Sequence, residues 1–289
     1  MNVPETRNDL PKIIWVLWLQ GFENAPEIVK KCARTWERAN RNWRIVRLNE
    51  DKIKKYIDVR GVIRKNGKNV EKSDISDIVR IKLLAKYGGV WGASTCICQR
   101  PLDTWLHEYM DSGFFAFSEP AKDREIASWF LASRKKNYLT KSWCEKYVKY
   151  FIDNNFSNQN TEIGNFVKMK LEGLFNANKK TSQFWFSFFI KKLLKVYPYF
   201  ALHYKFYETI KSNHKAYSVW KKTPKYSADP PLEPIRNGLL DNPSPRIKEE
   251  VSKREVPLYK LNWGVDVEEM RDESLAEYIL MENPYLSNV

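Results

Sequence analysis

Asp77 and Arg80 are the two residues whose types and spacing bear most directly on chemistry. They lie three positions apart in the segment KSDISDIVRIKLLAKYGGVWGASTCICQRPLD, which runs from Lys72 to Asp103. A spacing of three places both side chains on one face of a helix. One interpretation is a surface ion pair. The other is a pair that binds a polyhydroxylated ligand, with the carboxylate accepting hydrogen bonds from hydroxyl groups and the guanidinium donating to oxygen atoms. The spacing leaves both open.

The helix that must position this pair is predicted from the pattern of apolar residues around it. Apolar side chains recur at helical spacing, at Ile75, Ile78, Val79, Leu83 and Leu84. Ser73 or Asp74 is expected to cap the first turn, and Gly88-Gly89 to end the helix and reverse the chain. Val90-Trp91 then opens a short buried strand. In α/β proteins the end of such a strand lies at a ligand crevice.

Strands and helices alternate before this segment. The pattern predicts a strand over 12–18, a helix over 24–38, a strand over 43–48 and a short helix over 49–57. Such alternation is typical of a parallel sheet with crossover helices. We therefore expect a mostly parallel α/β sheet flanked by helices.

Further elements are predicted on either side of the segment. A loop is expected over 58–71, because the region shows little periodicity. A strand is expected to follow Thr95, and a helix to begin at Pro101. Two more strands are predicted over 114–118 and 127–133, joined by a polar connection.

Composition bounds the possible functions. The chain has 289 residues, 43% of them apolar, so it can bury a sizeable core. The net charge is +14 and the pI about 9.4, which favours polyanionic partners: nucleic acid, an anionic membrane surface or phosphorylated small molecules. No zinc-finger, RNA-recognition or helix-turn-helix pattern accompanies the charge, so nucleic acid is not the expected partner.

Cysteine and histidine positions do not predict a metal site. Cys32, Cys96, Cys98 and Cys144 lack metal-ligand or redox spacing and are expected to be buried free thiols. His107, His203 and His214 are expected to be structural or surface residues. The stretch from Met1 to Asn8 is polar and lacks the apolar core of a signal peptide, so we expect a cytoplasmic protein.

Several motifs together resemble a known family. They are LPKIIWVLWLQGFENAPEIVKKCARTW near the start, SDIVRIKLLAKYGGVW followed by RPLDTWL, GFFAFSEP with ASWFLAS, and KTPKYSAD with PLYKLNW near the end. In this order they are similar to the capsular polysaccharide synthesis protein family, of the glycosyltransferase family 32 and initiating-mannosyltransferase type. The resemblance spans residues 11–263. It implies a GT-A-like, Rossmann-like fold with a helical C-terminal addition, and a retaining transferase that takes its sugar from a UDP- or GDP-sugar.

The resemblance also implies roles for individual residues. Asp123 and Arg124 match a family Asp-Arg pair and are expected to border the reacting carbon. The residues expected at the donor are Trp15, Trp18, Asp77, Arg80, Gly89, Ser94, Thr95 and Lys260. At least one of the two tryptophans is expected to serve core packing instead.

The chain departs from the family pattern at the expected metal site. Family members read Trp-x-Asp-Ala-Thr after the glycine pair and use the aspartate to hold Mn²⁺ or Mg²⁺ against the diphosphate, whereas this chain has Ala93 there. Alanine cannot ligate a metal, and the hydroxyl groups of Ser94 and Thr95 replace a carboxylate poorly. A histidine that relatives carry after Ser-Ala-Asp is also missing, in the irregular loop predicted over 224–245. Either Lys260 and Arg100 carry the leaving-group charge, or the chain is a catalytically inactive homologue that binds a nucleotide sugar or a glycan.

The organisation follows from changes in composition along the chain. We expect a nucleotide-sugar-binding core over 1–135, a helical acceptor region over 136–222, and a C-terminal part over 223–289 that completes the same domain with a strand over 257–263. The run 184–207 concentrates aromatic residues and lysines. It is interpreted either as a buried helical hairpin or as an interfacial helix pair that brings the enzyme to a glycan or lipid-linked acceptor on an anionic membrane, as a peripheral protein.

Overall fold

The computed structural model describes residues 9–62, 70–264 and 273–286. Its central sheet has the strand order β2-β1-β3-β6-β5, with bounds β1 Ile13–Leu17, β2 Arg44–Leu48, β3 Gly89–Gly92, β5 Phe114–Ala121 and β6 Arg124–Ser133. β1 pairs in parallel with β2 and β3, whereas β6 pairs antiparallel with both β3 and β5. Four of these five strands therefore point the same way, and the predicted α/β class with a mostly parallel sheet is confirmed.

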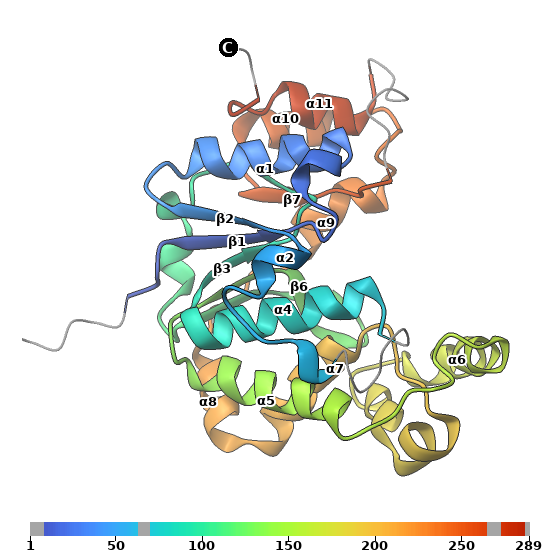
Figure 1. Cartoon of the computed structure of the whole chain (residues 1–289). Coiled ribbons are helices and arrows are strands. Elements are labelled where there is room, and N and C mark those ends of the chain that lie inside the picture. The colour runs from blue at the N-terminus through green and yellow to red at the C-terminus, as the bar shows by residue number, and fades with distance from the viewer. Residues whose placement is uncertain (1–8, 63–69, 265–272, 287–289) are drawn as a thin grey trace, which may run out of the picture.

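Helices cover both faces of the sheet (Figure 1). Their bounds are α1 Glu27–Ala39, α2 Glu50–Ile53, α4 Lys72–Tyr87, α5 Tyr138–Ile152, α6 Glu162–Phe175, α7 Ala201–Ser212, α8 His214–Lys222, α9 Asp229–Arg236, α10 Pro245–Lys253 and α11 Leu275–Met281. Shorter 3-10 and π turns are η1 Phe22–Asn24, η3 Leu102–Thr104, η4 Leu106–Tyr109, η5 Thr181–Phe186 and η6 Phe189–Leu194. None of the helices in the described ranges combines the length and apolar character needed to span a bilayer.

Side chains of β1 alternate between two hydrophobic cores, one on each face of the sheet. Ile14 and Val16 belong to the core beneath α1, while Trp15 and Leu17 belong to the core beneath α4. Figure 1 shows α1 and α10 on one side of the sheet and α4 and α5 on the other. A strand buried on both faces needs apolar residues at every position, which explains the continuous apolar run IIWVL of β1.

The central helix α4 forms as predicted, but its cap differs. The N-cap is Glu71 rather than Ser73 or Asp74, and the Asp74 side chain accepts a hydrogen bond from the Glu71 N–H at 3.2 Å. Asp74 therefore contributes to a capping box from the third helical position. Gly88 ends the helix with φ 70°, as the glycine pair predicted.

Gly89 holds a backbone conformation that other residues adopt with strain. Its φ is 91°, and an added Cβ would lie 2.5 Å from the Ile13 carbonyl oxygen in the neighbouring strand. We expect Gly89→Ala to lower the free energy of unfolding by roughly 2–4 kcal/mol. Gly173→Ala, on an exposed part of α6 with no atom within 4 Å of the added Cβ, should instead raise it by roughly 0.5–1 kcal/mol. Denaturant titration of both variants tests this, and equal effects would contradict it.

The predicted polar connection between the strands over 114–118 and 127–133 is wrong in extent. β5 continues to Ala121 and β6 begins at Arg124, so only Lys122 and Asp123 form the turn. Pairing of Ala121 with Arg124 closes this hairpin, and a register shift near Ser118 accommodates it. Glu119, Arg124 and Glu125 are therefore held on strands, whereas Lys122 and Asp123 lie in the turn.

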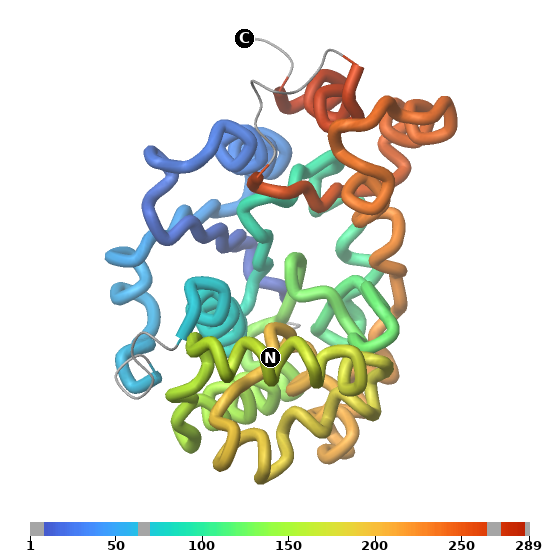
Figure 2. The backbone as a smooth tube through the Cα atoms, turned by 90° about the vertical axis from the view of Figure 1, so that its right-hand side faces the viewer, coloured from blue at the N-terminus to red at the C-terminus, as the bar shows by residue number. Residues whose placement is uncertain are grey.

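The helical region predicted from residue 138 onward is present, but the run 184–207 is not one helical hairpin. It contains η5, π-helical η6 and α7, with Lys195 in the left-handed region at φ 56° after η6. We call residues 161–200, which contain α6, η5 and η6, the α6 lobe. Figure 2 shows this lobe in yellow at the end of the molecule away from the C-terminus. The division of the chain at 135 and 222 stays a prediction.

The C-terminal part returns to the sheet region. The predicted closing strand is β7, Leu258–Lys260, which pairs antiparallel with β4, Cys96–Cys98, in a separate two-stranded sheet. The loop predicted over 224–245 is only partly irregular, because Asp229–Arg236 forms α9. The helix expected at Pro101 is a pair of 3-10 turns. The predictions for residues 1–8, and for 63–69 of the expected loop, lie outside the described residues.

Candidate functional site

A pocket lies at the edge of the sheet where β3 and β5 end and β6 begins. We call it the β3 pocket; its volume is about 450 Å³, within the range of small-molecule sites. It is lined by Ser73, Ser76, Asp77, Arg80, Ala93, Pro120, Arg124, Ala127, Ser128, Trp129, Tyr199, Phe200, His203, Leu232, Ile235, Arg236 and Lys260. Because α4 runs back along β3, its first two turns lie at this edge. The predicted pair Asp77–Arg80 is therefore placed in the crevice.

Asp77 and Arg80 form a buried ion pair rather than a surface one. Their side chains are 12% and 11% exposed, and Arg80 Nη2 lies 3.0 Å from Asp77 Oδ1. Arg80 Nη1 also donates to the carbonyl oxygen of Ser128 at 2.8 Å and to its hydroxyl at 2.5 Å. These bonds fix the guanidinium. Burial raises the pKa of Asp77 to about 6, against the lowering effect of Arg80.

Three further cations line the β3 pocket: Arg124, Arg236 and Lys260. The guanidinium carbon of Arg124 lies 3.7 Å from the ring centroid of Phe200. Arg236 donates to the Pro120 carbonyl oxygen at 2.9 Å. Lys260 Nζ donates to Thr95 Oγ1 at 2.7 Å, and burial lowers its pKa. The lining contains four basic side chains and one carboxylate, but each arginine is also ion-paired: Arg80 with Asp77, Arg124 with Asp123 and Arg236 with Asp229. Lys260 is the basic residue of the lining that has no carboxylate partner within the described residues, and the guanidinium groups offer fixed N–H donors around it, a combination suited to an anion.

Asp123, which is expected to border the reacting carbon, does not line the β3 pocket. It lies in the β5–β6 turn and is 5% exposed. Its carboxylate accepts hydrogen bonds from the Tyr204 hydroxyl at 2.5 Å and from Arg124 Nε at 3.1 Å. Asp123 is therefore a positioning residue that orients Arg124.

The residues at the expected metal position do not fit a divalent cation. Ala93 lines the pocket without a donor atom, and Thr95 is 4% exposed with its hydroxyl bonded to Lys260. Ser94 is half-buried and does not line the pocket. Asp77 is the one carboxylate of the lining and is paired with Arg80. The described residues contain no group of three or more His, Cys, Asp or Glu that could hold a metal ion.

Trp15 and Gly89 lie away from the pocket. Trp15 is 1% exposed and donates its indole N–H to the Gly88 carbonyl oxygen at 2.9 Å, at the opposite end of β3. It is therefore a packing residue, one of the two alternatives stated for the tryptophans. Trp18 lies at the carboxyl end of β1, half-buried, and its indole nitrogen finds no acceptor among the described residues. Trp18 lines neither the β3 pocket nor the second pocket, which follows the ends of β1 and β2.

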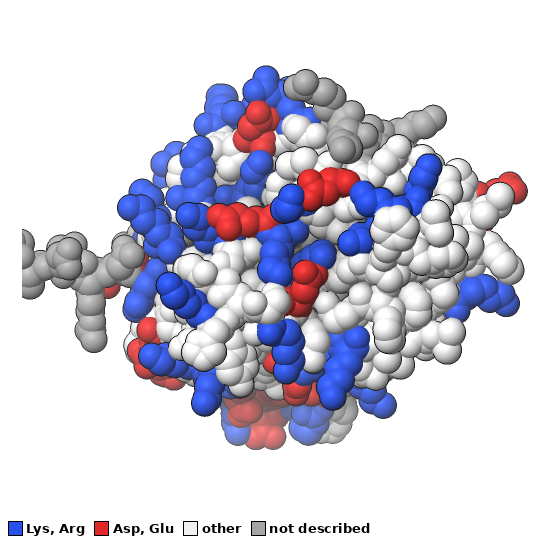
Figure 3. All heavy atoms as spheres, turned by 90° about the horizontal axis from the view of Figure 1, so that it is seen from below, with Lys and Arg blue, Asp and Glu red and all other residues white. Residues whose placement is uncertain are grey.

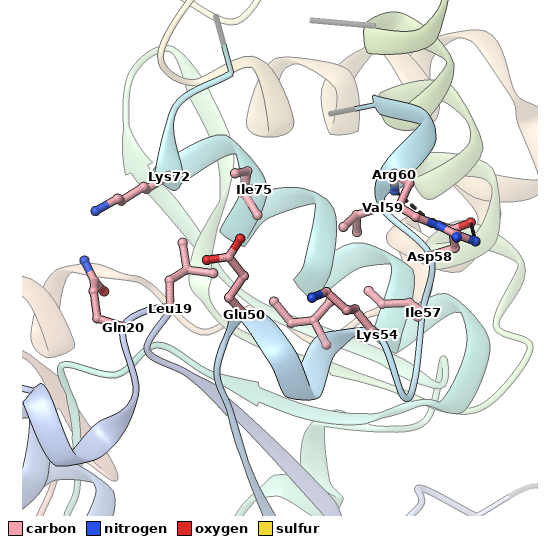
Figure 4. A pocket seen from close by; sticks show the side chains of 11 residues that line it. Leu19, Gln20, Glu50, Lys54, Ile57, Asp58, Val59, Arg60, Lys72 and Ile75 are labelled. Carbon is pink, nitrogen blue, oxygen red and sulfur yellow. Dashed lines mark hydrogen bonds and ion pairs between the residues drawn. The ribbon is translucent and has the colours of Figure 1, made fainter. Parts of the chain in front are cut away.

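A second pocket follows the ends of β1 and β2, and we call it the β1–β2 pocket. Its volume is about 490 Å³, and it is lined by Leu19, Gln20, Glu50, Ile53, Lys54, Ile57, Asp58, Val59, Arg60, Lys72 and Ile75. Figure 4 shows Gln20 and Lys72 at one side of it and the Asp58–Arg60 ion pair at the other. Lys72 and Ile75 belong to the same turns of α4 that supply Ser73 and Ser76 to the β3 pocket. The two pockets therefore flank one helix terminus.

Comparison with known families identifies the chain. A profile described as capsular polysaccharide synthesis protein matches residues 2–159, more than half of the sequence. The chain belongs to this family. The search of curated proteins gave no match. Among solved structures, the chain is similar to the PaToxG glycosyltransferase at 15% identity and a TM-score of 0.40, covering 73% of this chain and 74% of that one.

His203 is a pocket residue of this capsular polysaccharide synthesis protein that the sequence did not reveal. It was expected to be structural or at the surface, yet it lines the β3 pocket while 9% exposed. Its Nδ1 has no hydrogen-bond partner among the described residues. Burial, with Arg124 and Arg80 nearby, holds its pKa well below the usual value. A neutral imidazole therefore faces the pocket with one donor and one acceptor.

Ligand binding by this family member should depend on pH through Asp77. The ionised carboxylate accepts charge-assisted hydrogen bonds from hydroxyl groups at both oxygens, whereas the protonated form accepts weaker ones and fewer of them, so affinity for a sugar-containing ligand should rise as the pH increases through about 6. Because the folded protein retains a proton that the unfolded chain releases near pH 4, the contribution of Asp77 to unfolding free energy falls as pH rises from about 4 to about 6. Calorimetric titration measures the affinity, with Asp77→Asn as control. A pH-independent affinity in the unmodified protein would contradict it. The pKa of Asp74 is also raised, by burial, to about 7. Because Asp74 is present in both the unmodified protein and Asp77→Asn, the difference between the two affinity profiles isolates the effect of Asp77.

Proposed function

We propose that the protein is a GT-A-like glycosyltransferase of polysaccharide or glycan assembly. It would move a sugar from a UDP- or GDP-sugar to a hydroxyl of a glycan or lipid-linked saccharide at a membrane surface. The observation that carries the proposal is the lining of the β3 pocket, where the fixed Asp77–Arg80 pair lies beside Arg124, Arg236 and Lys260. Membership of the capsular polysaccharide synthesis protein family supports it.

The two pockets suggest how the donor would lie. The β1–β2 pocket has apolar walls from Leu19, Ile53 and Ile75, suited to a base and ribose. The β3 pocket would take the sugar and the diphosphate. Asp77 would accept hydrogen bonds from sugar hydroxyls. Arg80, whose Nη atoms contact Ser128, Ser76 and Asp77, would hold that carboxylate in place for the sugar. The first turn of α4 would lie between the two halves of the donor.

Catalysis would rest on the cations of the β3 pocket. The bond between the sugar's anomeric carbon and the diphosphate oxygen breaks, and both electrons leave with the diphosphate. Lys260, Arg124 and Arg236 would stabilise that charge in place of a metal ion. A bond forms from the acceptor hydroxyl oxygen to the anomeric carbon, and the hydroxyl proton passes to the departing phosphate. We propose retention of anomeric configuration, as the family resemblance implies.

A donor panel tests the proposal. Purified protein is incubated with UDP- and GDP-sugars, with manganese, with magnesium and with a chelator, and nucleoside diphosphate release is measured. We expect turnover of at least one donor that survives the chelator, and nuclear magnetic resonance of the product should show the retained anomer. Loss of turnover in chelator would contradict the metal-free site. Absence of both turnover and binding across the panel would overturn the proposal.

A second candidate is a non-catalytic homologue that binds a nucleotide sugar or a glycan. The observation in its favour is Ala93, which removes the family's metal ligand from an otherwise well-formed pocket. This candidate predicts saturable donor binding by calorimetry with no release of nucleoside diphosphate. Turnover of any donor rules it out.

A further inference from the structure

Exposed apolar side chains are concentrated in the α6 lobe. Of the 16 large apolar residues that the described chain exposes, nine lie between Ile163 and Tyr199. They are Ile163, Phe166, Met169, Leu174, Phe184, Phe188, Phe189, Leu193 and Tyr199, with exposed fractions from 55% to 75%. In Figure 3 the right-hand part of the lower surface, where Figure 1 places α6, is mostly free of charged side chains. Such a concentration marks an interaction surface.

The exposed residues are not part of the lobe's own core. Trp185, Ile190 and Val196 are buried in a separate cluster together with Tyr204, against which Leu171 and other inner residues pack. On α6, Leu171 and Phe175 face this cluster, whereas Phe166 and Met169 lie on the opposite face. Ile163 and Leu174 lie on the flanks between the two faces and are also exposed. The helix therefore has apolar residues on both sides, and only the inner side is covered by the described chain.

The charge of the lobe indicates what covers the outer side. Residues 161–200 contain seven lysines (168, 170, 179, 180, 191, 192 and 195) and two glutamates (162 and 172), a net charge of +5. Lys170 Nζ lies 5.5 Å from the ring centroid of Phe166, so charge and apolar surface are interleaved. Exposed aromatic rings among lysines match the interface of an anionic bilayer, where rings enter the headgroup region and ammonium groups contact phosphates.

We propose that the outer surface of the α6 lobe binds the surface of an anionic lipid bilayer. The lobe lies beside the candidate site, because Tyr199 and Phe200 at its C-terminal end also line the β3 pocket. A docked lobe therefore holds the mouth of that pocket near the lipid headgroups, within reach of a lipid-linked acceptor. This last consequence rests on the proposed function, whereas membrane binding itself does not.

Vesicle flotation tests the proposal with the full chain and no donor present. We expect the protein to float with vesicles that contain phosphatidylglycerol, to float less at high salt, and to stay in solution with pure phosphatidylcholine. The double variant Phe166→Ser with Phe188→Ser should lower the partition coefficient by at least about tenfold, because two exposed aromatic rings would no longer be buried among the lipid headgroups. The matched control is Leu240→Ser with Met281→Ser, exposed apolar residues outside the lobe, and should float as the parent does.

Several outcomes would overturn the proposal. They are no flotation of the parent protein, equal flotation of the two double variants, and salt-independent binding to neutral vesicles. Concentration-dependent dimerisation that only the lobe variant abolishes would assign the surface to a second copy of the chain instead. Donor turnover in vesicle-free solution separates membrane binding from the proposed transferase activity. The lobe variant should retain this turnover while it loses flotation. If the parent protein turned over a donor but did not float, membrane binding would be refuted and the transferase activity would stand.

Discussion

Lys260→Met is expected to lower donor turnover by about 100-fold, the usual effect of removing one group that stabilises developing charge. Lys260 lies in the β3 pocket and is held by Thr95, and its amino group can carry a positive charge that a methionine of similar length cannot, although burial lowers its pKa. The effect should fall on kcat more than on donor affinity, because the charge on the diphosphate grows as the bond breaks. Single-turnover kinetics with a donor identified from the panel measures both.

Lys225→Met is the matched control for this variant. Lys225 is also partly buried, with its Nζ 3.4 Å from the Trp220 ring centroid and its pKa lowered by burial to about 8. It does not line the β3 pocket. We expect Lys225→Met to retain turnover. If Lys260→Met kept parental kcat while thermal unfolding showed both variants folded, Lys260 would have no part in leaving-group stabilisation.

Ala93→Asp is expected to reduce turnover by roughly tenfold without creating a metal requirement. The new carboxylate would enter a pocket that also contains Arg80 and Lys260, neutralise part of their charge and repel the diphosphate. A neighbouring like charge of this kind typically changes an interaction by roughly 1–2 kcal/mol. Nucleoside diphosphate release, measured with manganese and with chelator, gives the result.

Ala93→Asn separates charge from size at the same position. Asparagine fills the same volume without the negative charge, so it should retain more turnover than aspartate. One result would contradict this prediction. If turnover appeared only in Ala93→Asp, and only with metal, the unmodified chain would be a disabled form of a metal-dependent transferase. The cation-based mechanism would then be wrong.

The parts of the site that follow from local sequence were predictable. Helical periodicity and the glycine pair placed α4 and β3 correctly, and a spacing of three put Asp77 and Arg80 on one helix face. The pair's burial was not predictable from spacing, because it depends on Ser128 from β6, 48 residues further along the chain. Periodicity reports which face a residue occupies but not what packs against that face.

The features that the sequence did not show depend on long-range contacts. Asp123 was expected beside the reacting carbon, and no local pattern indicated that its carboxylate accepts a hydrogen bond from Tyr204, 81 positions away. His203 was interpreted as structural because no metal-ligand spacing surrounds it, whereas packing of α7 brings it to the pocket. Arg236 went unnoticed because a proline-rich segment favoured a loop over the short helix α9. In each case tertiary packing, not residue type, decides the role.

The pairing of β4 with β7 also bears on when the site forms during protein synthesis. Cys96 pairs with Lys260 across this two-stranded sheet, so the chain must be extended by 164 residues before the contact can form. The strands β1, β2, β3, β5 and β6 are all translated by residue 133, and the ribosome adds residues at roughly 5–20 per second. A nascent chain therefore has every strand of the central sheet well before Lys260 emerges. A premature stop codon before β7 would release a polypeptide that retains Asp77 and Arg80 but lacks one of the cations proposed to stabilise the departing diphosphate.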